Sequence, residues 1–380
     1  MKFDRFQKIE KELSPKRALI IYGPRRIGKT TMVKAFAEKN KNKQVLFSVG
    51  DDIRLQKLFN SGLRKEILEW AIPYEILIID EAQYIKNIGQ ATKMIVDEYP
   101  DKKIILTGSS SFEIAQNVGE PLTGRHFTMT LLPIMQNELQ KSNFERKEIL
   151  NDILIFGSYP EVLLQDTKKQ KIRILDELVN SFLFKDILIL DKIKSPDSLV
   201  DILRALAFQI GNEVSFAEIG NLVGRDVKTV QRYIDILEKT FVLKRVRGYS
   251  KNLRNEISRK SKFYFYDLGV RNAIINQYNE VELRNDVGVL WENFVFMELY
   301  KKSLALKEYK DFYFWRTHGG LEVDIVTEKD GKISAYECKW SKIDSKNLKL
   351  FKTTYPSAGI NIVNGRGINE GKDISMKVAG

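Results

Sequence analysis

The sequence has little of what marks exported or membrane-embedded proteins. Cys338 is its one cysteine in 380 residues, so no disulfide can form within the chain, and a reducing compartment is favoured. No apolar run approaches the ~20 residues that a bilayer-spanning helix needs. Residues 1–17 are charged throughout and lack the apolar stretch of a secretory signal. We therefore expect a cytoplasmic protein without a membrane partner.

Acidic residues are outnumbered by basic ones. Asp and Glu total 50 against 62 Lys and Arg, which gives a net charge of +12. This balance fits a polyanionic partner such as DNA, although a solvated lysine-rich surface has the same composition. The 43% hydrophobic and 29% charged content is typical of a globular chain. The length predicts about two to three domains.

Residues 18–31 carry the clearest motif. Residues 18–22 are apolar and predict a buried strand, residues 23–30 match G-x-x-x-x-G-K-[ST], and good helix formers follow. Glycines let backbone amides surround a polyphosphate, Lys29 can reach the β- and γ-phosphates, and the Thr30 hydroxyl can bind Mg²⁺. We therefore predict a site for ATP and Mg²⁺. Its predicted nucleotide-contacting residues are Gly23, Pro24, Arg25, Arg26, Ile27, Gly28, Lys29, Thr30 and Thr31.

A second signature lies at residues 75–81, where an apolar run ends in two acids. A strand that is apolar on both faces belongs in the centre of a parallel sheet. At its end, Asp80 is placed to hold Mg²⁺ opposite Thr30, and Glu81 is placed to deprotonate an attacking water. Helix capping by these acids is the alternative, but the pairing with the phosphate loop favours hydrolysis.

Polar residues also follow a strand at residues 102–108. If this strand lies between the two above, Thr107 and Ser109 face the γ-phosphate, although helix capping accounts equally for some of these hydroxyls. Arg125 precedes another strand, at residues 126–132. Its guanidinium suits phosphate, so it is a candidate arginine sensor or finger, with an ordinary surface arginine as the alternative. Alternating strands and helices predict a doubly wound α/β sheet.

The middle of the chain has helical periodicity. Helices are expected at residues 198–211, 216–223 and 227–239, followed by strands at 241–246 and 263–267. Three helices and a two-stranded wing are the winged helix-turn-helix pattern. A charged loop, or a winged helix used for internal docking, are the alternatives. Tyr249 in the wing is available to stack on a sugar or base. The predicted nucleic-acid contacts are Lys228, Gln231, Arg232, Arg245, Arg247, Lys251 and Arg254.

The last third of the chain combines strands with a second set of acids. Strand alternation puts Asp324 on a polar face, and Glu337 and Lys339 together on another. On neighbouring strands, Asp324 and Glu337 can converge on Mg²⁺ or Mn²⁺ while Lys339 steadies a water or the scissile phosphate. Glu292, on the preceding helix, can reach the same cation. The alternative is a solvated face with an acid–lysine ion pair.

With these residues placed, the whole chain resembles a prokaryotic family that joins an AAA-type (STAND-like) P-loop ATPase to a winged helix and a PD-(D/E)XK nuclease-like domain of unknown function. The shared marks are GPRRIGKTT, LIIDEAQ, TGSSS, LTGR, GSYPE, and the spaced EVD and ECK. In the wider ATPase class a Gly-x-Pro element contacts adenine, which implies that role for Gly157 and Pro160. Relatives commonly carry a second glycine where this chain has Ser158.

The resemblance implies an α/β protein of three domains: a P-loop ATPase at residues 1–145, a helical and winged-helix domain at 146–275, and a restriction-endonuclease-like domain at 276–380. It implies an ATPase that controls DNA binding and a metal-dependent nuclease. The alternative is a nucleotide-switched DNA- or protein-binding regulator whose nuclease-like domain is non-catalytic. A small-molecule kinase is disfavoured because no acceptor-binding signature is present. If Arg125 acts across subunits, a homo-oligomer is required.

Overall fold

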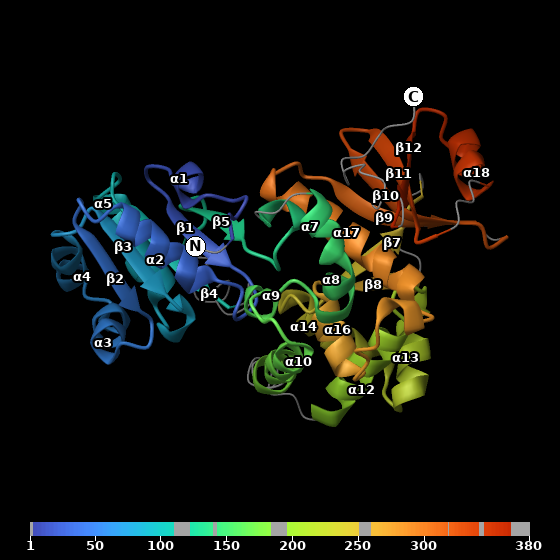
Figure 1. Cartoon of the computed structure of the whole chain (residues 1–380). Coiled ribbons are helices and arrows are strands. Elements are labelled where there is room, and N and C mark those ends of the chain that lie inside the picture. The colour runs from blue at the N-terminus through green and yellow to red at the C-terminus, as the bar shows by residue number, and fades with distance from the viewer. Residues whose placement is uncertain are drawn as a thin grey trace. The chain divides into compact units, whose positions relative to one another are not determined.

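The computed structural model describes residues 3–109, 122–139, 143–183, 196–250, 260–317, 319–341 and 346–365. They form two compact units (Figure 1), residues 1–133 with 239–241, and residues 134–238 with 242–380. No helix of the described part is long and apolar enough to cross a membrane.

The described residues of the first unit contain a five-stranded sheet in the order β2-β3-β4-β1-β5, and each neighbouring pair is parallel. Strand β4 lies between the strand before the phosphate loop and the strand that ends in Asp80, which is the condition under which Thr107 and Ser109 are expected to face the γ-phosphate. The elements are α1 Ile9–Glu12, β1 Ala18–Tyr22, α2 Lys29–Lys39, β2 Val45–Val49, α3 Ile53–Ser61, α4 Arg64–Ala71, β3 Ile76–Asp80, η1 Ala82–Tyr84, α5 Ile88–Glu98, β4 Lys103–Gly108 and β5 His126–Thr130.

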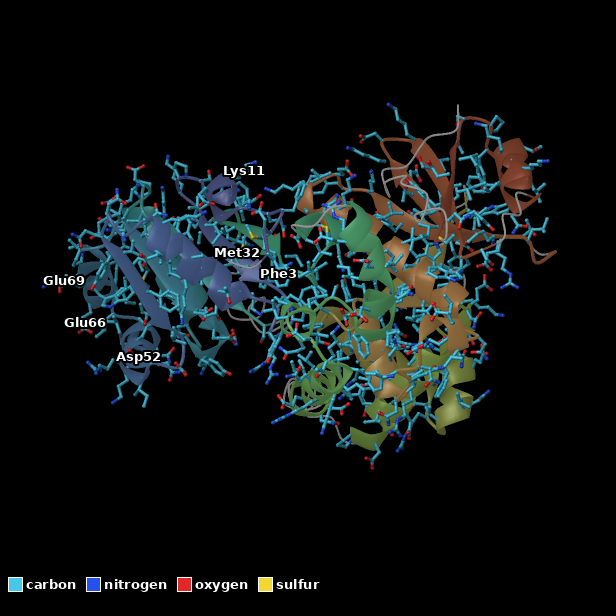
Figure 2. All side chains as sticks on the ribbon, in the orientation of Figure 1. Phe3, Lys11, Met32, Asp52, Glu66 and Glu69 are labelled. Carbon is cyan, nitrogen blue, oxygen red and sulfur yellow. The ribbon has the colours of Figure 1, made fainter. Side chains whose placement is uncertain are left out.

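Burial explains why these strands are central. Every residue of β1 and β3 is buried, as the continuous apolar runs predict. Met32 is one of the buried residues of helix α2, whereas Glu66 and Glu69 of α4 are exposed (Figure 2). Asp52 begins α3 by accepting a hydrogen bond from the Arg54 backbone N–H at 2.8 Å. The α/β fold with a parallel sheet is confirmed for this unit.

The described residues of the second unit combine helices with a seven-stranded sheet in the order β12-β11-β10-β9-β7-β8-β6. Strand β7, from the domain predicted at residues 146–275, pairs in parallel with β9, from the domain predicted at residues 276–380. The elements up to β8 are η3 Gln136–Glu138, α7 Asn143–Glu148, α8 Leu150–Phe156, α9 Pro160–Leu163, α10 Lys168–Glu177, η4 Leu178–Leu183, α12 Pro196–Phe208, β6 Val214–Ser215, α13 Phe216–Val223, α14 Val227–Lys239, β7 Leu243–Gly248 and β8 Lys260–Phe265.

The remaining elements carry the second acidic site. They are α16 Leu268–Ile274, η5 Val281–Leu283, α17 Val287–Ala305, β9 Asp311–Arg316, β10 Glu322–Lys329, β11 Lys332–Lys339, α18 Lys346–Thr354 and β12 Gly359–Asn364. One core cluster includes Trp315, Val326 and Phe351, and α18 packs against β10. Helices α13 and α14 and the β7–β8 hairpin follow the order of the predicted winged helix, which stays a prediction, as do the three domain boundaries.

Candidate functional site

The phosphate loop connects β1 to α2 and has the geometry of an anion cradle. Gly23 has φ 151°, and a Cβ there would lie 2.1 Å from the Leu131 carbonyl oxygen. Gly28 has φ 95° and precedes α2 without a side-chain cap. The first amides of α2 therefore keep their donor capacity for a bound anion.

Two buried cations hold this loop. Lys29, 4% exposed, donates from Nζ to the carbonyls of Gly23 (2.8 Å) and Pro24 (2.9 Å). Arg5 is also 4% exposed and donates to the Ile27 carbonyl at 2.6 Å and the Leu132 carbonyl at 2.9 Å. Sequence reasoning missed Arg5, because no motif marks an isolated arginine so far ahead of the loop.

Three residues predicted from separate motifs meet at the end of β3. The Thr30 hydroxyl donates to Asp80 Oδ2 at 2.7 Å, and the Thr107 hydroxyl donates to Asp80 Oδ1. Asp80 is only 3% exposed, so these bonds fix its carboxylate. Hydroxyl and carboxylate oxygens are the ligands that Mg²⁺ prefers, and Thr30 with Asp80 therefore fits the magnesium of a bound nucleotide.

Glu81 is held from both neighbouring strands. Its backbone is left-handed, with φ 52°, and its N–H donates to Thr107 Oγ1 at 3.0 Å. Gly50, after β2, approaches so closely that a Cβ there would lie 2.2 Å from the Glu81 carbonyl oxygen. Gln83 donates through its side chain to the Glu81 carboxylate. Glu81, next to Asp80, is thereby positioned by Gly50 after β2 and Thr107 on β4, and its role as a base stays a prediction.

The other predicted nucleotide contacts lie around the same loop. Arg25 donates to the Tyr84 hydroxyl at 3.4 Å, and Arg26 has a left-handed φ of 58°. Thr31 is exposed on the first turn of α2, and Ser109 is buried directly after β4. Their contacts with nucleotide stay predictions.

Arg125 is not brought to the phosphate loop of its own chain. Strand β5 runs parallel to β1 with His126 opposite Ala18, so Arg125 lies at the amino edge of the sheet. The loop lies at the carboxyl edge, about 16 Å away along a five-residue strand. Arg125 Nε instead donates to Asp97 Oδ1 at 2.6 Å.

The Gly-Ser-Tyr-Pro turn lies in the second unit and packs on the start of α16. Gly157 has φ 75°, and a Cβ there would lie 2.0 Å from Asp267 Oδ1. Asp267 accepts from the Ser158 N–H at 2.7 Å and from the Val270 N–H at 3.1 Å. Burial raises the pKa of Asp267, although these amides oppose the rise. The contact of Gly157 and Pro160 with adenine stays a prediction.

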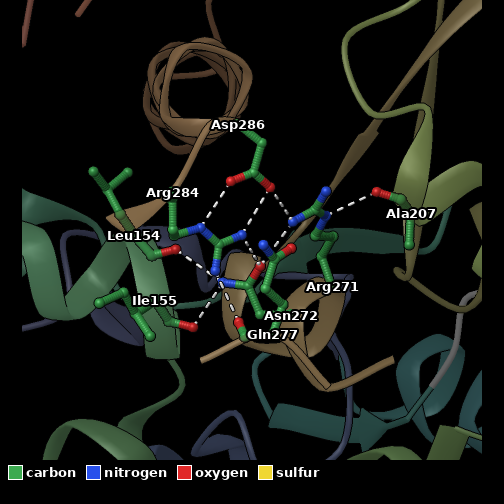
Figure 3. Close-up of polar contacts among 8 residues, drawn as sticks. All are labelled: Leu154, Ile155, Ala207, Arg271, Asn272, Gln277, Arg284 and Asp286. Atoms are coloured by element: carbon green, nitrogen blue, oxygen red, sulfur yellow. Dashed lines mark hydrogen bonds and ion pairs between the residues drawn. The ribbon is translucent and has the colours of Figure 1, made fainter. Parts of the chain in front are cut away.

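A buried network fixes the helix before this turn (Figure 3). The Asn272 amide donates to the carbonyls of Leu154 and Ile155 near the end of α8, at 3.0 and 2.8 Å. The Asn272 carbonyl oxygen accepts from Arg271 and Arg284. Both guanidiniums also reach the Asp286 carboxylate at 2.8 Å.

Helix α14 is the third helix of the predicted winged helix, and its predicted nucleic-acid contacts lie on an exposed face. Lys228, Gln231 and Arg232 of α14 are exposed, as is Arg247 of β7. Arg245 differs, because its guanidinium lies 3.4 Å from Glu238 and 3.9 Å from Asp235. Lys251 and Arg254 lie outside the described residues.

The expectation for Tyr249 is wrong. Its ring is 9% exposed and contacts Tyr313 and Tyr355 edge-on, at centroid distances of 5.3 and 5.4 Å. Its backbone N–H donates to the Phe314 carbonyl at 2.6 Å. The addition of β9 beside β7 buries this ring, so it does not present a face to a base.

The second acidic site lies on β10 and β11. These strands are antiparallel with Ile325 opposite Tyr336, so Asp324 and Glu337 share one face. The Cys338 N–H donates to Asp324 Oδ2 at 2.7 Å, and Lys339 Nζ lies 2.6 Å from Glu337 Oε1. Glu337 is 1% exposed, and its Oε2 has no hydrogen-bond partner within the described residues.

Burial raises the pKa of both acids, and the charge of Glu292 adds to the rise. For Asp324, burial is reinforced by the charges of Glu292 and Glu337. For Glu337, burial is opposed by its bond to Lys339. Both carboxylates therefore lie where burial and a neighbouring acid disfavour their charged form.

Glu292 is held by two residues that the sequence did not single out. Lys262 Nζ lies 2.9 Å from Glu292 Oε1 and also pairs with Glu322. The Tyr264 hydroxyl donates to the same Glu292 oxygen at 2.6 Å. In the described part of the chain, no three His, Cys, Asp or Glu side chains stand together as metal ligands. Glu292 is therefore not brought into one ligand set with Asp324 and Glu337.

The fold and loop geometry define the first unit as an AAA-type P-loop domain, and residues 15–140 match a family described as an AAA domain. Residues 147–280 and 287–377 match two domains of unknown function, DUF8612 and DUF4143.

Relatives span most of the chain. The uncharacterized protein MJ1544 of Methanocaldococcus jannaschii is 26% identical over 92% of this chain and 85% of its own length. The uncharacterized protein Rv2008c of Mycobacterium tuberculosis is 23% identical over 84% and 70%. A solved DnaA with AMPPCP and single-stranded DNA is 18% identical, covers 59% of this chain and 83% of its own, and has a TM-score of 0.31.

Proposed function

We propose that the first unit binds and hydrolyses ATP. The observation that carries this proposal is the convergence of Thr30, Asp80 and Thr107 beside an uncapped helix start. Lys29 binds the phosphates, Thr30 and Asp80 hold Mg²⁺, and Glu81 accepts the proton of the attacking water. Magnesium supplies charge neutralisation at the phosphates.

ATP binding tests this proposal directly. Lys29→Ala removes the charge aimed at the β- and γ-phosphates, so we expect ATP affinity measured by calorimetry to fall by about a hundredfold or more. Lys34→Ala is the matched control, because Lys34 lies exposed on the same helix. Equal ATP affinity in Lys29→Ala and the wild type would overturn the assignment of the loop.

Arg125 fits this function only across subunits. It lies at the opposite sheet edge from its own phosphate loop, so the role of arginine finger requires the nucleotide of a second copy. Turnover per chain is then expected to rise with protein concentration in the wild type and not in Arg125→Ala. Turnover that is independent of concentration would remove Arg125 from catalysis.

We further propose that nucleotide state controls a DNA contact and a metal-dependent nuclease site in the second unit. The exposed basic face of α14 supports the contact. At the acidic site, Glu213, Glu292, Glu322, Asp324 and Glu337 face Lys262, Arg316 and Lys339, a net charge of −2 when all are ionised. A divalent cation would balance that charge, and Glu337 Oε2, which has no hydrogen-bond partner in the described part of the chain, would offer it a ligand.

At this site Asp324 and Glu337 would hold Mg²⁺ or Mn²⁺, which supplies an activated water. Lys339 would steady the scissile phosphate. We expect plasmid to be cut by the wild type with either metal and not by Lys339→Ala. Equal cutting by both would point to a contaminant, and cutting by neither would favour the regulator with a non-catalytic nuclease-like domain.

A further inference from the structure

Lys262 is a fully buried cation beside the acidic site. Its side chain is 1% exposed, and it comes from β8, outside the elements that carry Asp324 and Glu337. It pairs with Glu292 of α17 and Glu322 of β10. Burial opposes its charge, but Glu292, Glu322 and Asp324 outweigh burial and raise the pKa of Lys262. The two ion pairs therefore hold the Lys262 ammonium among these acids.

The bonds at Glu292 show what Lys262 does there. Glu292 Oε1 accepts from both Lys262 at 2.9 Å and Tyr264 at 2.6 Å, so two donors from one strand orient this carboxylate. Asp324 and Glu337 have neither contact. Their carboxylates meet the Cys338 N–H and Lys339 instead. Glu292 and Glu322 thus have a direct ion pair with buried Lys262, whereas the recorded partners of Asp324 and Glu337 are a backbone amide and Lys339.

We propose that Lys262 is a positioning residue that withholds Glu292 from the divalent cation and confines the cation to Asp324 and Glu337. This inference rests on the proposed cation site. A unit charge fixed within the acid cluster repels a divalent cation, and together with the Tyr264 hydroxyl it occupies the lone pairs of Glu292 Oε1. The site of the wild type is accordingly a weak two-carboxylate site. Withdrawal of the Lys262 side chain converts it into a three-carboxylate site.

The test measures Mn²⁺ binding to the nucleotide-free full-length protein by electron paramagnetic resonance. We expect the wild type to bind Mn²⁺ weakly at a site that Asp324→Asn removes. Lys262→Met should bind at that same site at least about tenfold more tightly. Lys260→Met, which removes an exposed charge from the same strand, should leave the affinity unchanged.

Lys262→Met also leaves buried Glu292 and partly exposed Glu322 without their shared cation, and this can lower the stability of the protein. A double variant, Lys262→Met with Glu322→Gln, keeps the net charge of the cluster and still frees Glu292. It should bind Mn²⁺ at least about threefold more tightly than the wild type and show a larger rise in melting temperature with Mn²⁺.

Two outcomes separate this inference from the proposal beneath it. Mn²⁺ binding that Asp324→Asn removes, with equal affinity in the wild type and the foldable Lys262 variant, would overturn the role of Lys262 alone. No Asp324-dependent binding in any variant would overturn the cation site and the inference together.

Discussion

Two buried arginines of the second unit depend on one acidic residue. Arg271 and Arg284 share one carboxylate, Asp286, and their side chains are 2% and 0% exposed. The Asn272 carbonyl oxygen accepts from both guanidiniums and so takes part of the excess charge. One carboxylate therefore supports two buried cations and the helix end that Asn272 binds.

Asp286→Asn tests this dependence. It leaves two buried guanidiniums without a carboxylate, so we expect a loss of about 3–5 kcal/mol in the free energy of unfolding of the second unit. Asp201→Asn, on the exposed face of α12, is the control and should change little.

The stabilisation that Asp286 contributes should fall as the pH is lowered. Burial works against the charge of Asp286, but Arg284 and Arg271 outweigh it and lower its pKa. Its stabilisation is then present above the usual carboxyl range near 4 and is lost as pH falls through the lowered value. The difference between the wild type and Asp286→Asn in urea unfolding should therefore shrink with acidification. A gap that widens in acid would contradict the pairing.

Among the elements, the turn between α8 and α9 depends on a single glycine. Gly157 combines a left-handed φ of 75° with a carboxylate oxygen where its Cβ would be. Gly288, in the first turn of α17, has nothing within 4 Å of that position.

We expect opposite effects from the same substitution at these two glycines. Gly157→Ala should destabilise the second unit by about 2–3 kcal/mol through strain and displacement of Asp267. Gly288→Ala should be neutral or stabilising by up to about 1 kcal/mol, because alanine is the better helix former. Calorimetric melting of both variants checks this, and a harmless Gly157→Ala would show that the turn is not anchored on α16.

Elements defined by local pattern were predicted well from the sequence. The predicted bounds of α13 and α14 match those of the structure, because capping by Ser215 and the apolar stripe of α14 are local signals. The first strand also matches, since β1 is apolar and ends at a glycine. The acids and hydroxyls at Thr30, Asp80 and Thr107 converge because strand order follows from the motifs.

Long-range pairing was not predictable in this way. Nothing in residues 243–248 indicates that β9 will lie beside β7, and this pairing buries Tyr249. No local pattern distinguishes Lys262, because its partners Glu292 and Glu322 lie at least 30 residues away in the chain. Only the folded sheet brings those charges together.

For the whole molecule, the net charge of +12 and the exposed basic face of α14 together predict that DNA binding depends on salt. If phosphate contacts dominate, DNA affinity falls steeply with salt, by about 0.9 in logarithmic slope for each contact. Lys228 and Arg232 replaced by alanine should reduce that slope by about 2.

The control removes the same charge elsewhere. Lys41 and Lys65 are exposed in the first unit, and their replacement by alanine should leave the slope unchanged. Fluorescence anisotropy with a labelled duplex measures both slopes. Equal slopes in the wild type and both variants would show that α14 is an ordinary solvated surface.

The central claim is that the first unit hydrolyses ATP with Glu81 as the base. The most direct measurement compares ATP affinity and steady-state phosphate release in the wild type and Glu81→Gln. Glutamine keeps the shape of the side chain but cannot accept the proton of the water. We predict unchanged ATP affinity with turnover reduced by about a hundredfold or more. Turnover equal to that of the wild type would contradict the account.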